Sequence, residues 1–253
     1  MTGATSSFLG GRGAPAKATE LNARASSDFA VKLTETQALL RQAAALGEVT
    51  QASSLGAEDV VITHLINALA LDIPVFVLET GALHTETLAL LERTQAHSRA
   101  PVQVYHPQHE AVIHFIRDHG QDAMYRSIEL RKACCHVRKM EPLARALADK
   151  KGWITGLRRE QSNARAEVPL IDTSEVATKA LTKFNPLANW TWGDVWHYIA
   201  EQGVDYNPLH DQFYPSIGCA PCTRAVTLGE DFRSGRWWWE DEAAKECGLH
   251  VKK

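Results

Sequence analysis

The sequence has no apolar run near the length of about 18 residues that a membrane-spanning helix needs. It also has no excess of positive charge, because the formal net charge is −3. A basic field that would favour nucleic acid is therefore absent, and any anion site must come from local clusters of cations. The first 27 residues lack the apolar core of a secretory signal. These absences predict a cytoplasmic protein that binds neither membrane nor nucleic acid.

Cysteine is scarce, with five residues in a 253-residue chain that is long enough to bury its own core. The odd number argues against a secreted disulfide framework. Cys134 and Cys135 are adjacent, Cys219 and Cys222 form a CxxC pair, and Cys247 stands alone. Thiolates suit iron–sulfur clusters or zinc, but adjacent cysteines are unusual for zinc, whereas a cubane offers each thiolate a separate iron. The two pairs predict a [4Fe–4S] cluster, with zinc or buried redox-active thiols as alternatives, and leave Cys247 for chemistry.

Apolar segments of strand length alternate with segments of helical periodicity. Strands are expected over 49–54, 73–78, 102–105 and 153–155, and helices over 29–46, 59–71, 84–96, 110–119 and 137–148. A short helix is expected to open within 189–196. The alternation predicts an α/β fold with a doubly wound, mostly parallel sheet, in which ligands bind beyond the carboxyl ends of the strands.

The domain organisation follows from the same pattern. Residues 1–27 are small, polar and without periodicity, so we expect a flexible N-terminal arm. Residues 28–253 are expected to form a single domain. Its last part, about 215–253, is rich in Pro, Gly and Trp and is expected to be an extension that carries cluster-binding and catalytic residues.

An anion-binding loop is predicted where the first strand turns into a helix, at the sequence SSLGAED from Ser53. Small residues let the backbone approach an anion, and the exposed N–H groups of a helix start bind phosphate or sulfate. A tight turn with an N-cap serine is the alternative. The loop is neither a Walker A nor a GxGxxG motif. Its spacing is similar to the SxGxxD loop of the PP-loop family of adenine-nucleotide α-hydrolases, through Ser54, Gly56 and Asp59. The next strand ends where an adenosine could lie, at Leu78, Thr80 and Gly81.

Several longer motifs extend this likeness along the chain. They are KACCHVRKMEPL from Lys132, ITGLRREQS from Ile154, GCAPCTR from Gly218, RSGRWWWE from Arg233 and ECGLH from Glu246. With these motifs, the chain resembles the assimilatory adenylyl-sulfate (APS) reductases of the APS/PAPS reductase family, from about residue 53 to residue 250. One departure is Glu79, where the family usually has Asp.

The resemblance implies a catalytic role for Cys247. In this family the lone C-terminal cysteine attacks the sulfur of the sulfuryl group, AMP leaves, and thioredoxin reduces the cysteine S-sulfonate to release sulfite. A free thiol is only partly ionised at neutral pH, so Cys247 needs positive charge or a base nearby. His250 could help, or it could be an exposed residue of the tail.

The resemblance also implies a substrate site rich in cations. Charge must be neutralised where a thiolate attacks an anion, and arginine makes forked contacts with such oxygens. The family positions that hold the phosphosulfate match Lys139, Arg165, Arg233 and Arg236, with Arg158, Arg159 and Arg224 as weaker candidates. Gly156 is also expected at the substrate site. Of the three consecutive tryptophans, for which packing is the alternative, Trp237 beside Arg236 is expected near the substrate. Cys135 precedes Lys139 by four residues, which puts both on one face if the segment is helical.

Three other functions remain open from the sequence. A PAPS reductase shares the fold and the C-terminal cysteine but lacks the cysteine pairs. A zinc-stapled nucleotide-binding module without reductase activity would leave Cys247 unused. An ATP pyrophosphatase shares the loop but not the tail. As a reductase, the protein is expected to use an external thioredoxin or glutaredoxin, and its oligomeric state is open, a homo-oligomer included.

Overall fold

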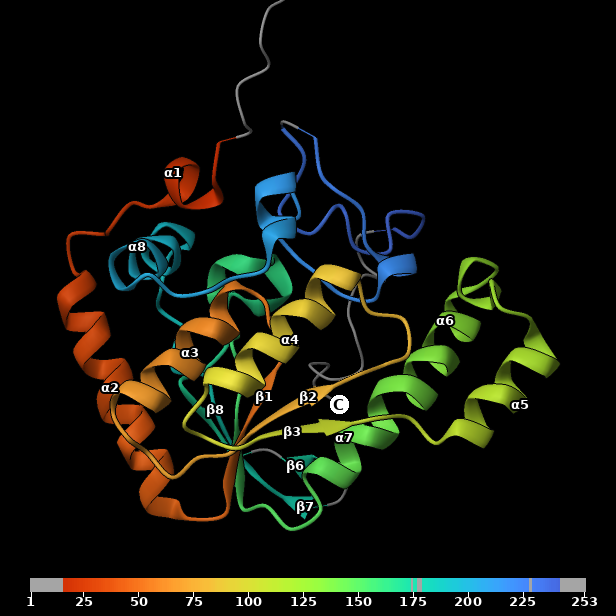
Figure 1. Ribbon diagram of the computed structural model, residues 1–253, viewed down its shortest axis with the longest axis horizontal. Coiled ribbons are helices and arrows are strands. Elements are labelled where there is room, and N and C mark those ends of the chain that lie inside the picture. The colour runs from red at the N-terminus through yellow and green to blue at the C-terminus, as the bar shows by residue number, and fades with distance from the viewer. Residues whose placement is uncertain (1–15, 174, 177–178, 228, 242–253) are drawn as a thin grey trace, which may run out of the picture.

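The computed structural model describes residues 16–173, 175–176, 179–227 and 229–241 (Figure 1). Its main sheet has six strands in the order β3-β2-β1-β4-β8-β5. They are β1 (Val49–Ser53), β2 (Val75–Leu78), β3 (Val102–Tyr105), β4 (Gly152–Ile154), β5 (Ile171–Asp172) and β8 (Thr182–Phe184). All neighbours pair in parallel except β5, which pairs with β8 in antiparallel fashion. The predicted α/β fold with a mostly parallel sheet is confirmed.

Helices cover both faces of this sheet (Figure 1). One face packs against α2 (Phe29–Leu46), α3 (Ala57–Ala68), α4 (Thr85–His97) and α8 (Trp192–Gln202). The other face packs against α7 (Glu141–Ala146). Along β2, Val75 and Val77 pack with the apolar residues of α2, α3, α4 and α8. Phe76 packs instead with the apolar residues of α7 on the other face. A strand buried on both sides explains the uninterrupted apolar sequence there.

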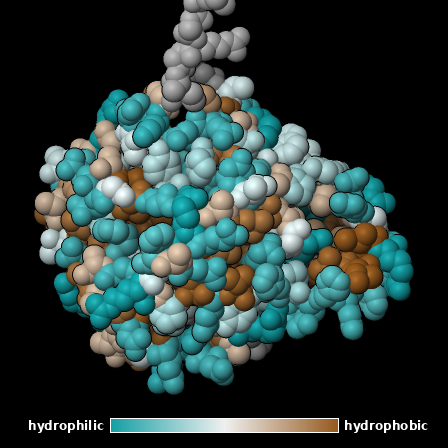
Figure 2. Space-filling model, viewed as in Figure 1, coloured by the Kyte–Doolittle hydropathy of each residue, from teal (hydrophilic) through white to brown (hydrophobic). Residues whose placement is uncertain are grey.

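A second lobe lies beside the sheet, at the right of Figure 1. It contains α5 (His109–His119) and α6 (Ile128–Cys135), which share an apolar cluster with Cys134, Cys219, Cys222 and Trp237. Hydrophobic residues also gather on the surface of this lobe (Figure 2), where Ile113 of α5 is 50% exposed.

The helix expected over 137–148 differs from the observed one. α6 ends at Cys135. The chain then forms a π-helical turn, His136–Met140, which leads directly into α7. Ser127 caps α6, since its side chain accepts a hydrogen bond from the Leu130 N–H at 3.2 Å. Single π turns often occur at functional sites, and this one directly follows the cysteine pair.

The strand order places a crevice next to β1. The chain leaves β1 toward β2 and β3 and then returns to β4 on the other side of β1. The carboxyl ends of β1 and β4 therefore form the topological switch point, where open α/β sheets bind ligands.

Segments outside the main sheet complete the fold. Residues 18–22 of the expected flexible arm form helix α1 (Ala18–Asn22), which packs against α8, and the Ala18 N–H donates to Asp211 Oδ1 at 2.7 Å. Strands β6 (Glu175–Val176) and β7 (Lys179–Ala180) pair separately. No helix in the described part of the chain is both long and apolar enough to cross a membrane.

Candidate functional site

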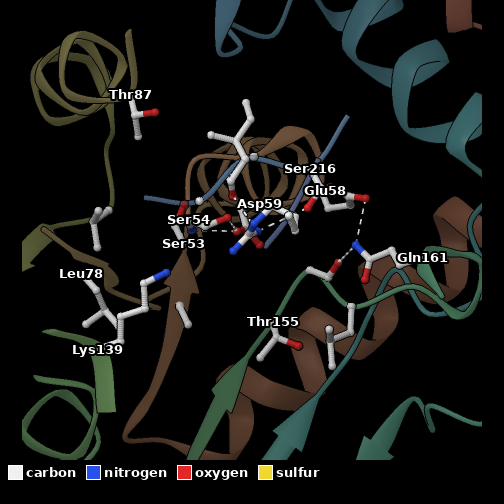
Figure 3. Close-up of a pocket in the computed structure, with 18 of the residues that line it drawn as sticks. Ser53, Ser54, Glu58, Asp59, Leu78, Thr87, Lys139, Thr155, Gln161 and Ser216 are labelled. Atoms are coloured by element: carbon white, nitrogen blue, oxygen red, sulfur yellow. Dashed lines mark hydrogen bonds between the residues drawn. The ribbon is translucent and has the colours of Figure 1, made fainter. Parts of the chain in front are cut away.

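A cavity lies beyond the carboxyl ends of β1, β2 and β4 (Figure 3). Of the residues predicted to bind substrate, the structure brings eleven together around it: Ser54, Gly56, Asp59, Leu78, Thr80, Lys139, Gly156, Arg165, Arg233, Arg236 and Trp237. Gly81 lies instead at a neighbouring cavity. His250 and Cys247 lie outside the described residues. The switch point and the predicted substrate site therefore coincide.

The loop after β1 is organised by Asp59, in the first turn of α3. Asp59 Oδ2 accepts hydrogen bonds from the Ser54 N–H and hydroxyl, both at 2.7 Å. Burial raises the pKa of Asp59 to about 6, against the lowering effect of the Ser54 hydrogen bonds. A Cβ atom at Gly156 would overlap with Asp59 Oδ1, so β4 must be followed by glycine for the two segments to meet. The carboxylate thus shapes the loop and joins it to β4.

Arg165 reaches the cavity from the 3-10 turn Asn163–Arg165. Its Nη1 donates to Gln161 Oε1 at 2.7 Å. The Gln161 amide in turn donates to Glu58 Oε1 at 3.0 Å, as the dashed line in Figure 3 shows. Arg165 is only 7% exposed. Its guanidinium is thus buried and is linked through Gln161 to Glu58 on α3.

Two further arginines come from the C-terminal segment. Arg233 and Arg236 are 9% and 7% exposed and line the same cavity. The Arg236 guanidinium lies 4.7 Å from the centre of the Trp237 ring. The guanidinium also packs closely on Gly218, where an added Cβ atom would overlap with it. Together with Lys139, which faces the loop from the side of Leu78 (Figure 3), these side chains make a site suited to an anion with several oxygens.

The second cavity is lined by all four paired cysteines, Cys134, Cys135, Cys219 and Cys222. None of the four is in a disulfide, and three of them are buried. Burial raises the pKa of Cys222 to about 12 and also raises the pKa of Cys134. In the described part of the chain, no three His, Cys, Asp or Glu side chains are grouped so that they could hold a metal ion. The two pairs, far apart in sequence, nevertheless share one pocket.

The two cavities are neighbours. Lys139 lines both of them, and Cys135 lies with it at the cysteine cavity, four residues earlier along the helix. Thr80 lines the first cavity, and its hydroxyl lies 3.3 Å from Cys219 Sγ. Trp237 lines the first cavity and packs in the apolar cluster of the cysteines. A change at one cavity can therefore reach the other through a single side chain.

Sequence reasoning missed several residues of the cavity. Among them are Glu58, Thr87, Gln161, His210, Ser216 and Phe232. Glu58 and Gln161 lie within motifs that the sequence singles out, but their spacing gives no separate signal. The weaker candidates Arg158, Arg159 and Arg224 do not line the cavity.

Fold and site together define an α/β protein with an anion site at the switch point of its sheet and a four-cysteine pocket beside it. Comparison with known proteins narrows this class. The phosphoadenosine phosphosulfate reductase domain family matches residues 48–225, which is more than half of the chain. The chain belongs to this family.

Two curated relatives place it among the adenosine 5'-phosphosulfate reductases of the family. The adenosine 5'-phosphosulfate reductase of Burkholderia cepacia is 49% identical over 88% of this chain and 89% of its own length. The one of Allochromatium vinosum is 51% identical over 82% of this chain and 80% of its own. The family predicted from the sequence is confirmed.

Solved structures show the same architecture. The PAPS reductase of Candida auris, solved as a phosphate complex, has a TM-score of 0.64 and 25% identity over 81% of this chain and all of that one. The FMN adenylyltransferase of Candida glabrata, bound to FMN and an ATP analogue, has a TM-score of 0.56 at 12% identity, over 93% of this chain and 88% of that one. The second likeness concerns the fold alone.

Proposed function

We propose that this protein reduces adenosine 5'-phosphosulfate to sulfite and AMP in assimilatory sulfate reduction, with electrons from thioredoxin or glutaredoxin. The observation that carries the proposal is the convergence of four cations from three segments on the switch-point cavity. These cations are Lys139, Arg165, Arg233 and Arg236. The curated relatives are named for this substrate, which fits a site for a nucleotide with an anionic end.

The cavity suggests how each end of the substrate is held. The ends of β1 and β2 supply Ser54 and Leu78, next to the N-terminus of α3, where backbone N–H groups favour a phosphate. The cations would hold the phosphosulfate oxygens. Charge-assisted hydrogen bonds of this kind contribute about 1.5–3 kcal/mol each when both groups are buried. AMP would remain bound by the same contacts after the sulfuryl group has left.

Cys247 is the proposed nucleophile. Its thiolate attacks the sulfuryl sulfur, an S–S bond forms, the S–O bond to phosphate breaks, and AMP takes the electron pair. A donor thiolate then attacks Cys247 Sγ, sulfite leaves, and the second thiol of the donor resolves the mixed disulfide. The surrounding cations stabilise the negative charge shared by nucleophile and substrate. His250 is proposed to assist at the same tail.

We further propose that Cys134, Cys135, Cys219 and Cys222 bind one [4Fe–4S] cluster. Their common pocket and their freedom from disulfides fit this group. Adjacent cysteines such as Cys134 and Cys135 are unusual as ligands of one zinc ion, whereas a cubane cluster offers each thiolate a separate iron. When bound, the cluster would tie the two cysteine segments together and act electrostatically on the neighbouring Lys139. Electrons would reach Cys247 through thiol exchange, in the reducing cytoplasm.

Sulfite release from APS and from its 3'-phosphorylated analogue tests this function. Purified protein is incubated with thioredoxin, a reductant for it and either nucleotide at equal concentration, with reactions lacking thioredoxin as the control. We expect thioredoxin-dependent sulfite, with the higher kcat/KM for APS. A higher value for the analogue would favour a PAPS reductase, and no sulfite from either nucleotide would refute both.

A further inference from the structure

Arg158 follows the end of β4 and is 1% exposed, yet it does not line the substrate cavity. Its guanidinium lies behind the cavity wall. Nε donates to Glu58 Oε1 at 2.9 Å, and Nη1 donates to Glu160 Oε2 at 3.2 Å. The flat faces of two rings cover it, at 5.3 Å from the Trp192 centre and 5.8 Å from the Phe232 centre.

Two of these contacts, those with Glu58 and Phe232, are made with residues that line the cavity. Glu58 belongs to the first turn of α3 and lines the cavity itself. The same carboxylate oxygen accepts from Gln161, whose Oε1 accepts from Arg165 Nη1 at 2.7 Å and from the Arg158 backbone N–H at 3.1 Å. Arg158 therefore reaches Arg165 by two routes.

The third route leads to the C-terminal segment. Phe232 packs on the Arg158 guanidinium and meets Trp192 edge-on, with 4.8 Å between ring centres. Phe232 immediately precedes Arg233, one of the cations of the cavity. The attraction between an arginine and the face of an aromatic ring is energetically significant when the group is buried. It fixes the segment from which Arg233 projects.

Arg158 also affects the net charge at the wall of the cavity, because it is paired with Glu58. Glu58 is 8% exposed and would place a negative charge at a site for an anion. Its pairing with a buried guanidinium from behind offsets that charge. Removal of Arg158 would leave the carboxylate with the neutral Gln161 amide and an uncompensated charge beside the ligand.

We propose that Arg158 is a positioning residue that sets Arg165 and Arg233 for the anionic end of the substrate and offsets the charge of Glu58, without touching the ligand. This inference depends on the proposed function, since it assigns those two arginines to the phosphosulfate. Its specific consequence is that Arg158 matters more as the ligand carries more negative charge beyond the ribose.

The test compares adenosine, AMP and ADP by calorimetric titration against wild type, Arg158→Lys and a control, Arg159→Lys. ADP places a second anionic group where the sulfate would lie and does not react with a thiol. Arg159 is the exposed neighbour, and within the described part of the chain its side chain donates to Val168 O and Asn189 Oδ1. Lysine keeps the charge of Arg158 but loses the fork and the flat face.

We expect Arg158→Lys to bind adenosine within about twofold of wild type, AMP roughly tenfold more weakly, and ADP more weakly still, each tenfold step being about 1.4 kcal/mol. Arg159→Lys should match wild type for all three. Phe232→Leu keeps every charge and should lose affinity in the same order, least for adenosine and most for ADP, but by smaller factors. This variant replaces Arg158→Lys in the test if Arg158→Lys does not fold.

Equal losses for all three ligands would mean a merely structural role and would overturn the inference. Unchanged binding in both Arg158→Lys and Phe232→Leu would overturn it as well. In either case a wild type that binds AMP and ADP leaves the proposed function standing. A wild type that binds none of the three refutes the proposed function, and this inference with it.

Discussion

Arg131 and Glu240 form a buried, two-pronged ion pair between the cysteine-bearing helix and the C-terminal segment. Arg131 Nη2 donates to Glu240 Oε2 at 2.7 Å and Nε donates to Oε1 at 3.0 Å. The two side chains are 1% and 3% exposed, and the guanidinium also lies 4.7 Å from the Trp237 ring centre. The pair therefore joins α6 to the chain seven residues before Cys247.

Glu240→Gln should destabilise the protein strongly, because it removes one charge of a buried, forked ion pair with Arg131. Loss of one partner of a buried pair costs about 3–5 kcal/mol. Urea unfolding measures this loss. Asp205→Asn serves as the matched control, since it breaks a forked pair with Arg93 whose side chains are 57% and 43% exposed, and it should cost at most about 1 kcal/mol. Equal effects of the two substitutions would contradict the structural account of the pair.

Asp59 makes stability depend on pH in a defined direction. Burial raises its pKa from 3.8 to about 6, so the folded state binds the proton more tightly than the unfolded state. Stability from this group is fully present below pH 3.8 and is lost as the pH rises through about 6. Relative to Asp59→Asn, wild type should therefore lose up to about 3 kcal/mol between about pH 4 and about pH 6.5.

Urea unfolding of both proteins across this range measures the difference for Asp59. Above about pH 7 the difference should be constant, because the carboxylate is ionised in both states. A wild type that gains stability over the variant as the pH rises would show that the Ser54 hydrogen bonds outweigh burial, and it would contradict a raised pKa for Asp59.

The four-cysteine pocket predicts stoichiometric iron and sulfide in protein purified without oxygen. Cys219→Ser and Cys222→Ser should lose iron, because each removes one cluster ligand. Thr223→Ser, at the next buried position, is the control, since it retains the hydroxyl that donates to Cys219 O at 3.0 Å. Colourless protein with one zinc per chain and full activity would exclude the cluster.

The sequence predicted those parts of the site whose chemistry is local. The spacing of Ser54, Gly56 and Asp59 places them in one turn, and that turn lines the cavity. The sequence assigns the two cysteine pairs to one site because thiolates are ligands of iron–sulfur clusters, and the four side chains do line one pocket. Strand β2 is the clearest of the strands in the sequence, because a strand buried on both faces of a parallel sheet reads as an uninterrupted apolar run.

The features that the sequence did not predict depend on contacts between distant segments. Nothing in a local pattern shows that Arg158 lies behind the cavity and not in it, because its place is decided by Glu58 and Phe232. The π turn after Cys135 has no periodicity of its own. Strand β5 has only two residues, and β8 is a three-residue segment that begins with the polar Thr182 and Lys183, so neither stands out as an apolar strand.

Covalent labelling of Cys247 tests the central claim most directly. Wild type is mixed with APS in the absence of any thiol reductant, and the digested protein is examined by mass spectrometry, with Cys247→Ser as the control. The account predicts that the peptide containing Cys247 gains the mass of one SO₃ group, that thioredoxin removes it as sulfite, and that the variant gains nothing while still binding AMP. An adduct on any of the four paired cysteines, or steady sulfite production by Cys247→Ser, would contradict it.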